Sequence, residues 1–299
     1  MSYKSINPKD IPVPQLQGFL QGAIGPRPIA FASTIDAEGR PNLSPFSFFN
    51  VFSANPPILV FSPARRGRDN TTKHTYENAK KHPEVVINVV SYDIVEQMSL
   101  SSTEYAEGVS EFEKAGLTPI KSDLVKPYRV RESPVQMECK INQVIELGEN
   151  GGAGNLIICE IVKMHIHEAV LGEDGKIDQN KIKLVARLGG NWYSKGFGDA
   201  LFEIEKPLTT LGIGVDSIPE EIRCSEILTG NNLGQLGNVE ALPDETEVND
   251  YRLIELSDLF MELEDEPKKL ELELHKMAKE LLANKKVKEA WMTLLAFNN

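Results

Sequence analysis

The sequence predicts a mainly β protein, an antiparallel barrel or sandwich in the first two thirds of the chain, followed by an α-helical C-terminal extension. Up to about residue 167, short segments rich in Val, Ile and Phe alternate with turn residues, as the strands of an antiparallel sheet do. Beyond residue 206, apolar residues recur at helical spacing instead. We therefore expect two domains, residues 1–205 and residues 206–299.

Five apolar runs are the expected strands, and turn residues bound each of them. The turn DAEG (36–39) predicts a hairpin into the next segment, with Gly39 supplying the unusual backbone angle. GENGGAGN (148–155) also predicts a hairpin, because a strand follows it and not the helix that a dinucleotide-binding loop needs. The five runs are PIAFASTI (28–35), PPILVFS (56–62), EVVINVVS (84–91), VQMECKINQVIEL (135–147) and NLIICEIVKMHIH (155–167).

Helices are expected at 71–82 and 91–102, and again throughout the extension. There, Ser217 and Glu220 have the spacing of a capping box. The apolar stripes of residues 251–297 need a surface to pack on, because short isolated helices are marginal in water. A structural cover on the barrel, a lid over the site and an acidic docking surface for a partner protein all remain open.

The composition excludes several classes of protein. The net charge is −12, most of it from residues 206–299, so the chain should repel nucleic acid. No apolar run is long enough to cross a bilayer, and the N-terminus does not have the pattern of a secretory signal. Cys139, Cys159 and Cys224 lie far apart without a CxxC pair, which suits a reducing compartment. We expect a cytoplasmic protein with neither a nucleic-acid nor a membrane partner.

The run RRGRDNTTKHTYENAKKH (65–82) predicts an anion site at the start of a helix. Thr71 or Thr72 would cap this helix, and its first turn would hold Lys73, His74 and Thr75. Free backbone N–H groups, hydroxyls and a lysine at a helix start suit a phosphate group. Positive charge is otherwise unfavourable at this end of a helix. The alternative is a solvated basic loop.

The segment SPFSFFN (44–50) is unusual for a core strand, which would use Val, Ile or Leu. If the segment is one strand, Phe46 and Phe48 face one side while Ser47 and Phe49 face the other. Aromatic and small polar side chains on both faces indicate a surface that meets something other than the core.

Two histidines, His165 and His167, would share one face of a strand. A metal site is not expected, because no third ligand lies nearby in the sequence and Lys163 shares their face. Partial burial or substrate contact is the alternative. Motifs of hydrolases and of P-loop nucleotidases are absent from the sequence.

Several motifs together, in the same order, resemble the flavin reductase-like proteins of the FMN-binding split barrel family. The resemblance covers residues from about 20 to 200. The segments that carry it are GPRPIAFAST (25–34), GRPNLSPFSFFN (39–50), SANPPILVFS (53–62), TKHTYENA (72–79), VINVVS (86–91), EYAEGVSEFEKAGLTP (104–119), RESPVQMECKI (131–141) and VARLGGNWY (185–193).

This resemblance implies an antiparallel Greek-key split barrel with short helices, which forms a homodimer and holds FMN without a covalent bond. The positions implied beside the flavin are Ser47, Phe48, Phe49 and Asn50. Those that approach from the neighbouring strand are Arg27, Ser33 and Thr34. Those at the phosphate end are Ser62, Arg68, Lys73 and Thr75. His74 departs from the family pattern, because many relatives carry an acidic residue there.

The function implied is an FMN-dependent oxidoreductase, a flavin reductase. NADH or NADPH would deliver hydride to flavin N5, and the electrons would pass to an acceptor or a partner protein. The flavin carries this chemistry, so no catalytic acid or base is expected. We expect His165, His167, Trp192 and Tyr193 to line the substrate face. One alternative is an FMN-binding electron carrier without nicotinamide activity. A scaffold that has lost its flavin is disfavoured by the residues at the phosphate end.

Overall fold

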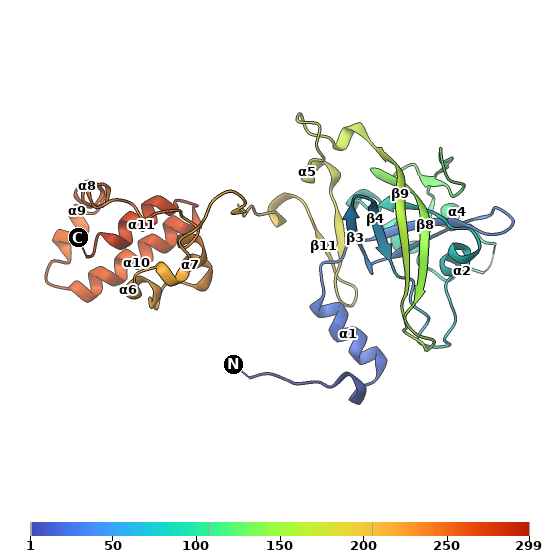
Figure 1. The fold of residues 1–299 in the computed structure, drawn as a ribbon, viewed down its shortest axis with the longest axis horizontal. Helices are drawn as coiled ribbons and strands as arrows, with labels where there is room; N and C mark the ends of the chain where they lie inside the picture. The colour runs from blue at the N-terminus through green and yellow to red at the C-terminus, as the bar shows by residue number, and fades with distance from the viewer. Residues whose placement is uncertain (1, 107, 205, 299) are drawn as a thin grey trace. The chain divides into compact units, whose positions relative to one another are not determined.

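The computed structural model describes residues 2–106, 108–204 and 206–298. Contacts divide the chain into two compact units, Met1–Phe202 and Glu203–Asn299 (Figure 1). The sequence prediction put this boundary at 205/206. The first unit holds all the strands that the structure describes, and the second holds helices α6 to α11.

The first unit is built on a seven-stranded sheet in which every neighbouring pair is antiparallel. The five strand predictions are confirmed, as is the hairpin through DAEG into β2, where Gly39 has a φ of 80°, and β3 is added to them. The strands are β1 (Ala30–Ile35), β2 (Pro41–Phe46), β3 (Phe49–Ala54), β4 (Pro57–Phe61), β5 (Glu84–Val89), β8 (Val135–Glu146) and β9 (Asn155–Ile166). Their order is β2-β1-β5-β8-β9-β4-β3. Two small sheets pair β6 (Pro119–Ile120) with β7 (Arg129–Val130), and β10 (Val185–Arg187) with β11 (Tyr193–Lys195).

The strand order explains why this sheet forms a split barrel. Strands β2 and β3 lie at opposite edges of the sheet, yet only Ser47 and Phe48 separate them along the chain. A two-residue connection spans only a few ångströms, so the sheet must curl until its edges meet. The backbone N–H of Ser62 donates to the carbonyl of Phe48 at 2.8 Å and fixes this corner.

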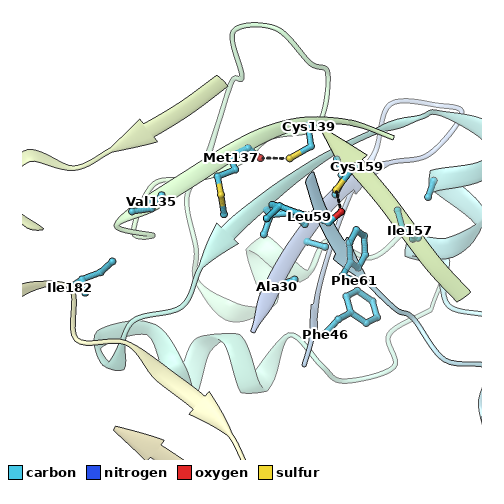
Figure 2. Packing of buried hydrophobic residues seen from close by; sticks show 14 of the residues in the cluster. Ala30, Phe46, Leu59, Phe61, Val135, Met137, Cys139, Ile157, Cys159 and Ile182 are labelled. Carbon is cyan, nitrogen blue, oxygen red and sulfur yellow. Dashed lines mark hydrogen bonds between the residues drawn. The ribbon is translucent and has the colours of Figure 1, made fainter. Parts of the chain in front are cut away.

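The corner also corrects a prediction, because residues 44–50 are not one strand. Phe46 ends β2 inside the barrel, where its ring packs on Phe61 at 5.6 Å between centroids (Figure 2). Phe48 lies on the corner itself and is 41% exposed. The pleat stops where the chain crosses from one edge of the sheet to the other, so strict alternation does not apply.

Two apolar clusters pack on opposite faces of the sheet. Ala30 and Ala32 point into the barrel, where Figure 2 shows Cys139, Cys159 and Leu59 among the packed residues. Phe31 points the other way, into a cluster formed with helices α3 (Val95–Leu100) and α4 (Glu111–Ala115). Alternation along β1 therefore accounts for both clusters.

The helices of this unit differ from the predictions in detail. Helix α2 (His74–Lys81) is present, but Lys73 occupies its N-cap position and no side chain caps it. Thr72 donates to Glu77 and Thr71 donates to Asp69, so neither threonine is the predicted cap. The helix predicted at 91–102 is a 3-10 turn followed by the short α3. Sequence reasoning missed α1 (Val13–Ala23), and α5 (Gln179–Ile182) is one turn long.

The second unit has its own core. Its helices are α6 (Glu220–Arg223), α7 (Gly230–Leu236), α8 (Glu245–Glu255), α9 (Ser257–Glu262), α10 (Pro267–Ala283) and α11 (Val287–Leu295). Their apolar stripes form two buried clusters within the unit, and the Trp291 indole donates to the carbonyl of Leu236 at 3.1 Å. Most of the apolar residues of the stripes therefore pack within the unit, while Leu253 is 71% exposed, and the structural cover stays a prediction.

The capping box predicted at Ser217 is wrong. Ser217 ends a 3-10 turn, and Pro219, which has no side-chain bond to the helix, precedes α6. A capping box does occur at α7, between Thr229 and Asn232. Within the described parts of the chain, no helix combines the length and the apolar character needed to cross a membrane.

Candidate functional site

The candidate site is built around Lys73, at the start of α2. Its side chain is half-buried and makes no hydrogen bond or ion pair with any residue that the structure describes. Burial lowers the pKa of Lys73, and the nearby charge of Arg66 lowers it further. A cation with partly lost hydration and like charges beside it is stabilised by an anion.

Three more features make the surroundings of Lys73 suitable for an anion. Arg66 and Arg68 line the same cavity, which has a volume of about 370 Å³. Arg66 is held in place, because it donates to the Thr71 hydroxyl at 2.9 Å and to the carbonyl of Thr72. The first turn of α2 also leaves N–H groups without intrahelical acceptors. Cations and free N–H groups thus converge at one helix start.

Buried amides fix this helix start on the sheet. Asn42, on β2, donates to the hydroxyl of Thr75 at 2.9 Å and to that of Thr34 at 3.3 Å. Asn78, on α2, also donates to Thr34, at 3.1 Å. Thr75 lines a small pocket beside Lys73, together with Asn42 and Ser44. Thr34 is fully buried, and its hydroxyl accepts from both amides.

The glycine-rich β8–β9 hairpin supports the loop that carries the arginines. Arg65 donates its N–H to the carbonyl of Ala153 at 2.8 Å, and Gly152 donates to the carbonyl of Arg65 at 3.0 Å. A Cβ on Gly151 would come within 3.0 Å of the Arg66 carbonyl oxygen, and one on Gly154 within 2.8 Å of Ser62 Oγ. Close approach of the Arg66 and Gly67 backbone therefore favours glycine at Gly151, whereas a side chain at Gly154 would meet the Ser62 hydroxyl.

The barrel corner connects to this pocket along two segments. Strand β2 runs from Asn42 and Ser44, which line the pocket, to the corner at Ser47. Ser62 is bonded to Phe48 and begins the loop that leads to Lys73. The corner presents polar and aromatic groups to solvent, since Phe48 and Asn50 are exposed. An elongated ligand with an anionic end at the Lys73 pocket and a flat apolar end at the barrel corner would fit this arrangement.

Comparison with known proteins gives the family to which the barrel belongs. Residues 24–183 match the family model of the flavin reductase like domain. The chain belongs to the flavin reductase-like family. The predicted resemblance is thereby confirmed, and the match ends before the helical unit. A relative from Aquifex aeolicus is 37% identical over 183 residues, which are 61% of this chain and 91% of that protein.

Solved structures also resemble this flavin reductase-like chain. Component B of nitrilotriacetate monooxygenase from Bacillus cereus is 32% identical, with a TM-score of 0.64 over 68% of this chain and 100% of that one. A 2-nitrobenzoate 2-nitroreductase from Pseudomonas fluorescens is 25% identical, with a TM-score of 0.60 over 70% and 100%. A putative flavin reductase with a split barrel domain from Shewanella frigidimarina is 29% identical, with a TM-score of 0.57 over 66% and 95%.

Among the residues predicted to bind the cofactor, Arg68, Lys73 and Thr75 line the cavities around Lys73. Ser47, Phe48, Phe49 and Asn50 lie at the barrel corner, where Phe49 packs against the barrel core. Thr34 and Ser62 are buried and line neither cavity.

Arg27 and Ser33 have other surroundings. Arg27 is buried and donates to the carbonyls of Gln21 at 2.7 Å, Ile24 and Leu188 at 2.9 Å, so it ties the end of α1 to the barrel. Burial lowers the pKa of Arg27. Ser33 is fully buried, and its hydroxyl has no partner within the described chain.

The four residues predicted for a substrate face are not brought together at the Lys73 pocket either. His167 accepts from the N–H of Ala169 at 3.1 Å and caps a 3-10 turn. Trp192 is 75% exposed. The Tyr193 ring lies under the Arg187 guanidinium at 4.6 Å and lines a separate cavity of about 210 Å³.

His165 contacts carboxylates that the sequence did not predict. Its Nε2 lies 2.7 Å from Glu138, and the possible ligand atoms of Asp123, Glu138 and His165 lie within 4.8 Å of one another. Both carboxylates lie far from His165 in the sequence, and only the fold brings them to it. Lys163 pairs with Asp123, and Glu138 accepts three backbone N–H groups. The cluster is thus explained as an ion-pair network.

Sequence reasoning missed Asn42, Arg66 and Glu104 in the pocket. Arg66 was visible within the basic run, but nothing local distinguished it from Arg65. Asn42 is a polar residue with apolar neighbours in a strand segment, and this pattern could have indicated a buried hydrogen-bonding role. Glu104 comes from a distant loop, and only the tertiary structure brings it to the arginines.

Proposed function

We propose that this flavin reductase-like protein is an FMN-dependent oxidoreductase that takes electrons from NADH or NADPH. The observation that carries the proposal is Lys73, half-buried and unpaired within the described chain, beside Arg66 and the start of α2. Such a place favours the phosphate monoester that ends FMN.

The residues present fit this cofactor. Lys73, Arg66 and the first N–H groups of α2 would hold the phosphate, and the Thr75 hydroxyl would donate to it. Ser47 to Asn50 would run beside the ring system, with the exposed Phe48 offering apolar contact. When bound, the flavin supplies the redox chemistry, accepting hydride from the nicotinamide and passing electrons onward. The chain's own residues bind, orient and exclude water, and no side chain need act as acid or base.

The acceptor of the electrons is a small molecule or a partner protein. Similar structures support both possibilities, since one is a monooxygenase component and another is a nitroreductase. We further propose that the protein works as a homodimer. Helix α1 has no buried residue, and Phe52 on the edge strand β3 is 69% exposed, which leaves apolar surface for a second copy to cover.

Anaerobic reduction tests the proposed function. NADH or NADPH is mixed with the FMN-loaded protein while the flavin absorbance is recorded. We expect bleaching with at least one of the two nicotinamides. If neither bleaches the flavin and FMN stays bound, the oxidoreductase proposal fails and the electron-carrier alternative takes its place.

A further inference from the structure

Glu104 occupies a place in the cationic pocket that neither the family resemblance nor the sequence assigned. Its carboxylate bridges the two guanidinium groups, with Oε1 at 2.9 Å from Arg66 Nε and Oε2 bonded to Arg68. Glu104, Arg66, Arg68 and Lys73 all line the same cavity of about 370 Å³. An acidic side chain thus binds the groups that a phosphate would need.

Arg65 also lines this cavity, so its lining holds four cations and one carboxylate, a net charge of +3. This net positive charge attracts a phosphate monoester, which carries about −1.5 to −2 at neutral pH. The influence of Glu104 also reaches the ammonium, because its charge raises the pKa of Lys73 while Arg66 and Arg68 lower it. A phosphate placed at Lys73 and the carboxylate of Glu104 are therefore close enough to repel each other.

We propose that Glu104 is a specificity-determining residue that competes with the ligand's phosphate for Arg66 and Arg68. The carboxylate occupies Nε of Arg66 and Nη2 of Arg68, so a phosphate that takes these N–H groups must displace it. Weakly charged anions cannot displace it, whereas a dianionic phosphate attached to a bound flavin can. Glu104 thereby lowers the affinity for FMN and holds the arginines in place between ligands. This inference rests on the proposed function of FMN binding.

A positioning role for Glu104 predicts the opposite change in FMN affinity, so one experiment distinguishes the two roles. If Glu104 only positioned the arginines for the phosphate, its loss would loosen them and weaken FMN binding. If Glu104 competes, removing its charge strengthens binding. The side chain is 37% exposed, so its replacement should not disturb folding.

The experiment compares FMN and riboflavin titrations of the full-length wild type with those of E104Q and E104A, followed by quenching of flavin fluorescence. We expect both variants to bind FMN about tenfold more tightly, which corresponds to ~1.4 kcal/mol. The affinity for riboflavin, which has no phosphate, should not change. Because a larger net positive charge remains, FMN binding by both variants should also fall more steeply with salt.

A matched control is E113Q, which removes one exposed carboxylate from α4 outside the pocket. It should change FMN affinity by less than about twofold, because Glu113 lines neither cavity around Lys73 and solvent screens exposed charges. If the wild type binds FMN and the Glu104 variants bind it equally or more weakly, the inference is wrong and the proposed function stands. If the wild type binds no FMN, both are wrong.

Discussion

Lys73 carries the central argument at the scale of single residues. Its ammonium has lost part of its hydration. The positive charges of Arg66 and Arg68 lie near it and lower its pKa. A half-buried position beside other cations is unfavourable for a lysine, because desolvation and like charge both disfavour its charged form. An anion that reaches Lys73, Arg66 and the start of α2 together would compensate for both effects.

Replacing Lys73 with Ala should weaken FMN binding by about tenfold to a hundredfold. A charge-assisted hydrogen bond contributes ~1.5–3 kcal/mol, which gives this range. Titration of the apoprotein with FMN measures it, and riboflavin should bind both forms alike. K279A, which removes an exposed lysine from α10, is the control for net charge. Unchanged FMN affinity in K73A would refute the role given to Lys73.

Single residues also show how far the sequence could lead. The anion site at Lys73 could be predicted, because a lysine at the start of a helix is visible in a short stretch of sequence. Glu104 could not, since its partners lie more than thirty residues away in the chain. The contribution of Asn42 depends on pairing with Thr75, which only the fold brings within 2.9 Å.

At the scale of elements, the sequence predicted which segments form strands, but it did not predict how the sheet closes into a barrel. All five apolar runs became strands, because Val, Ile and Phe suit a half-buried pleated surface. The corner at Ser47 and Phe48 was missed, because alternation says nothing about where a sheet must close. Helix α1 was missed because it has no buried face within the unit, and burial is what usually reveals a helix in the sequence.

The contact between α10 and the turn before α7 predicts a pH dependence. His275 is buried, and its Nδ1 lies 2.7 Å from the Ser225 hydroxyl. Burial lowers the pKa of His275 below the ordinary 6.5. The unfolded chain then binds a proton at a higher pH than the folded unit does. The stability contributed by the neutral ring is therefore present above pH 6.5 and is lost as the pH falls through the folded pKa.

Urea unfolding of the full chain between pH 7.5 and pH 5.5 measures this effect. Fluorescence of Trp291, buried in the same unit, reports the transition, and a W192F background removes the other tryptophan. We expect the midpoint to fall as the pH decreases, and to fall less in H275N, which keeps a hydrogen-bonding group near Ser225. Identical pH slopes in the parent and H275N would contradict the assignment.

At the scale of the whole molecule, the chain joins a family domain to a helical unit with its own core. The family match covers only the first of these. The predicted cover was plausible because amphipathic stripes usually pack on something, and the structure shows that they pack on one another. A structural cover, a lid and an acidic docking surface are the roles of the second unit that experiment must separate.

Truncation after Pro207 separates these roles. Because each unit has its own buried clusters, the shortened protein should fold and bind FMN within about threefold of the full chain. A docking role predicts loss of electron transfer to a partner only. A lid predicts faster reaction of reduced flavin with oxygen, or faster FMN dissociation. Circular dichroism and stopped-flow oxidation measure these outcomes, and a truncated protein that does not fold would contradict the independence of the two units.

Light scattering tests the proposed homodimer. The chain has a mass of 33.2 kDa, and we expect a particle of about twice that mass. Phe52→Glu places a charge in the exposed apolar surface of β3 and should shift the particle toward one chain. A wild-type monomer that retains FMN would rule out a site that depends on a second copy.

The most direct test of the account is the identity of the flavin released from the purified protein. We propose that Lys73, with Arg66, Arg68 and Thr75, binds a single phosphate beside an exposed aromatic corner. The protein should therefore be yellow, and mass spectrometry of the material released by heat or acid should give the mass of FMN. Release of FAD alone, or failure of the apoprotein to take up added FMN, would contradict the central claim.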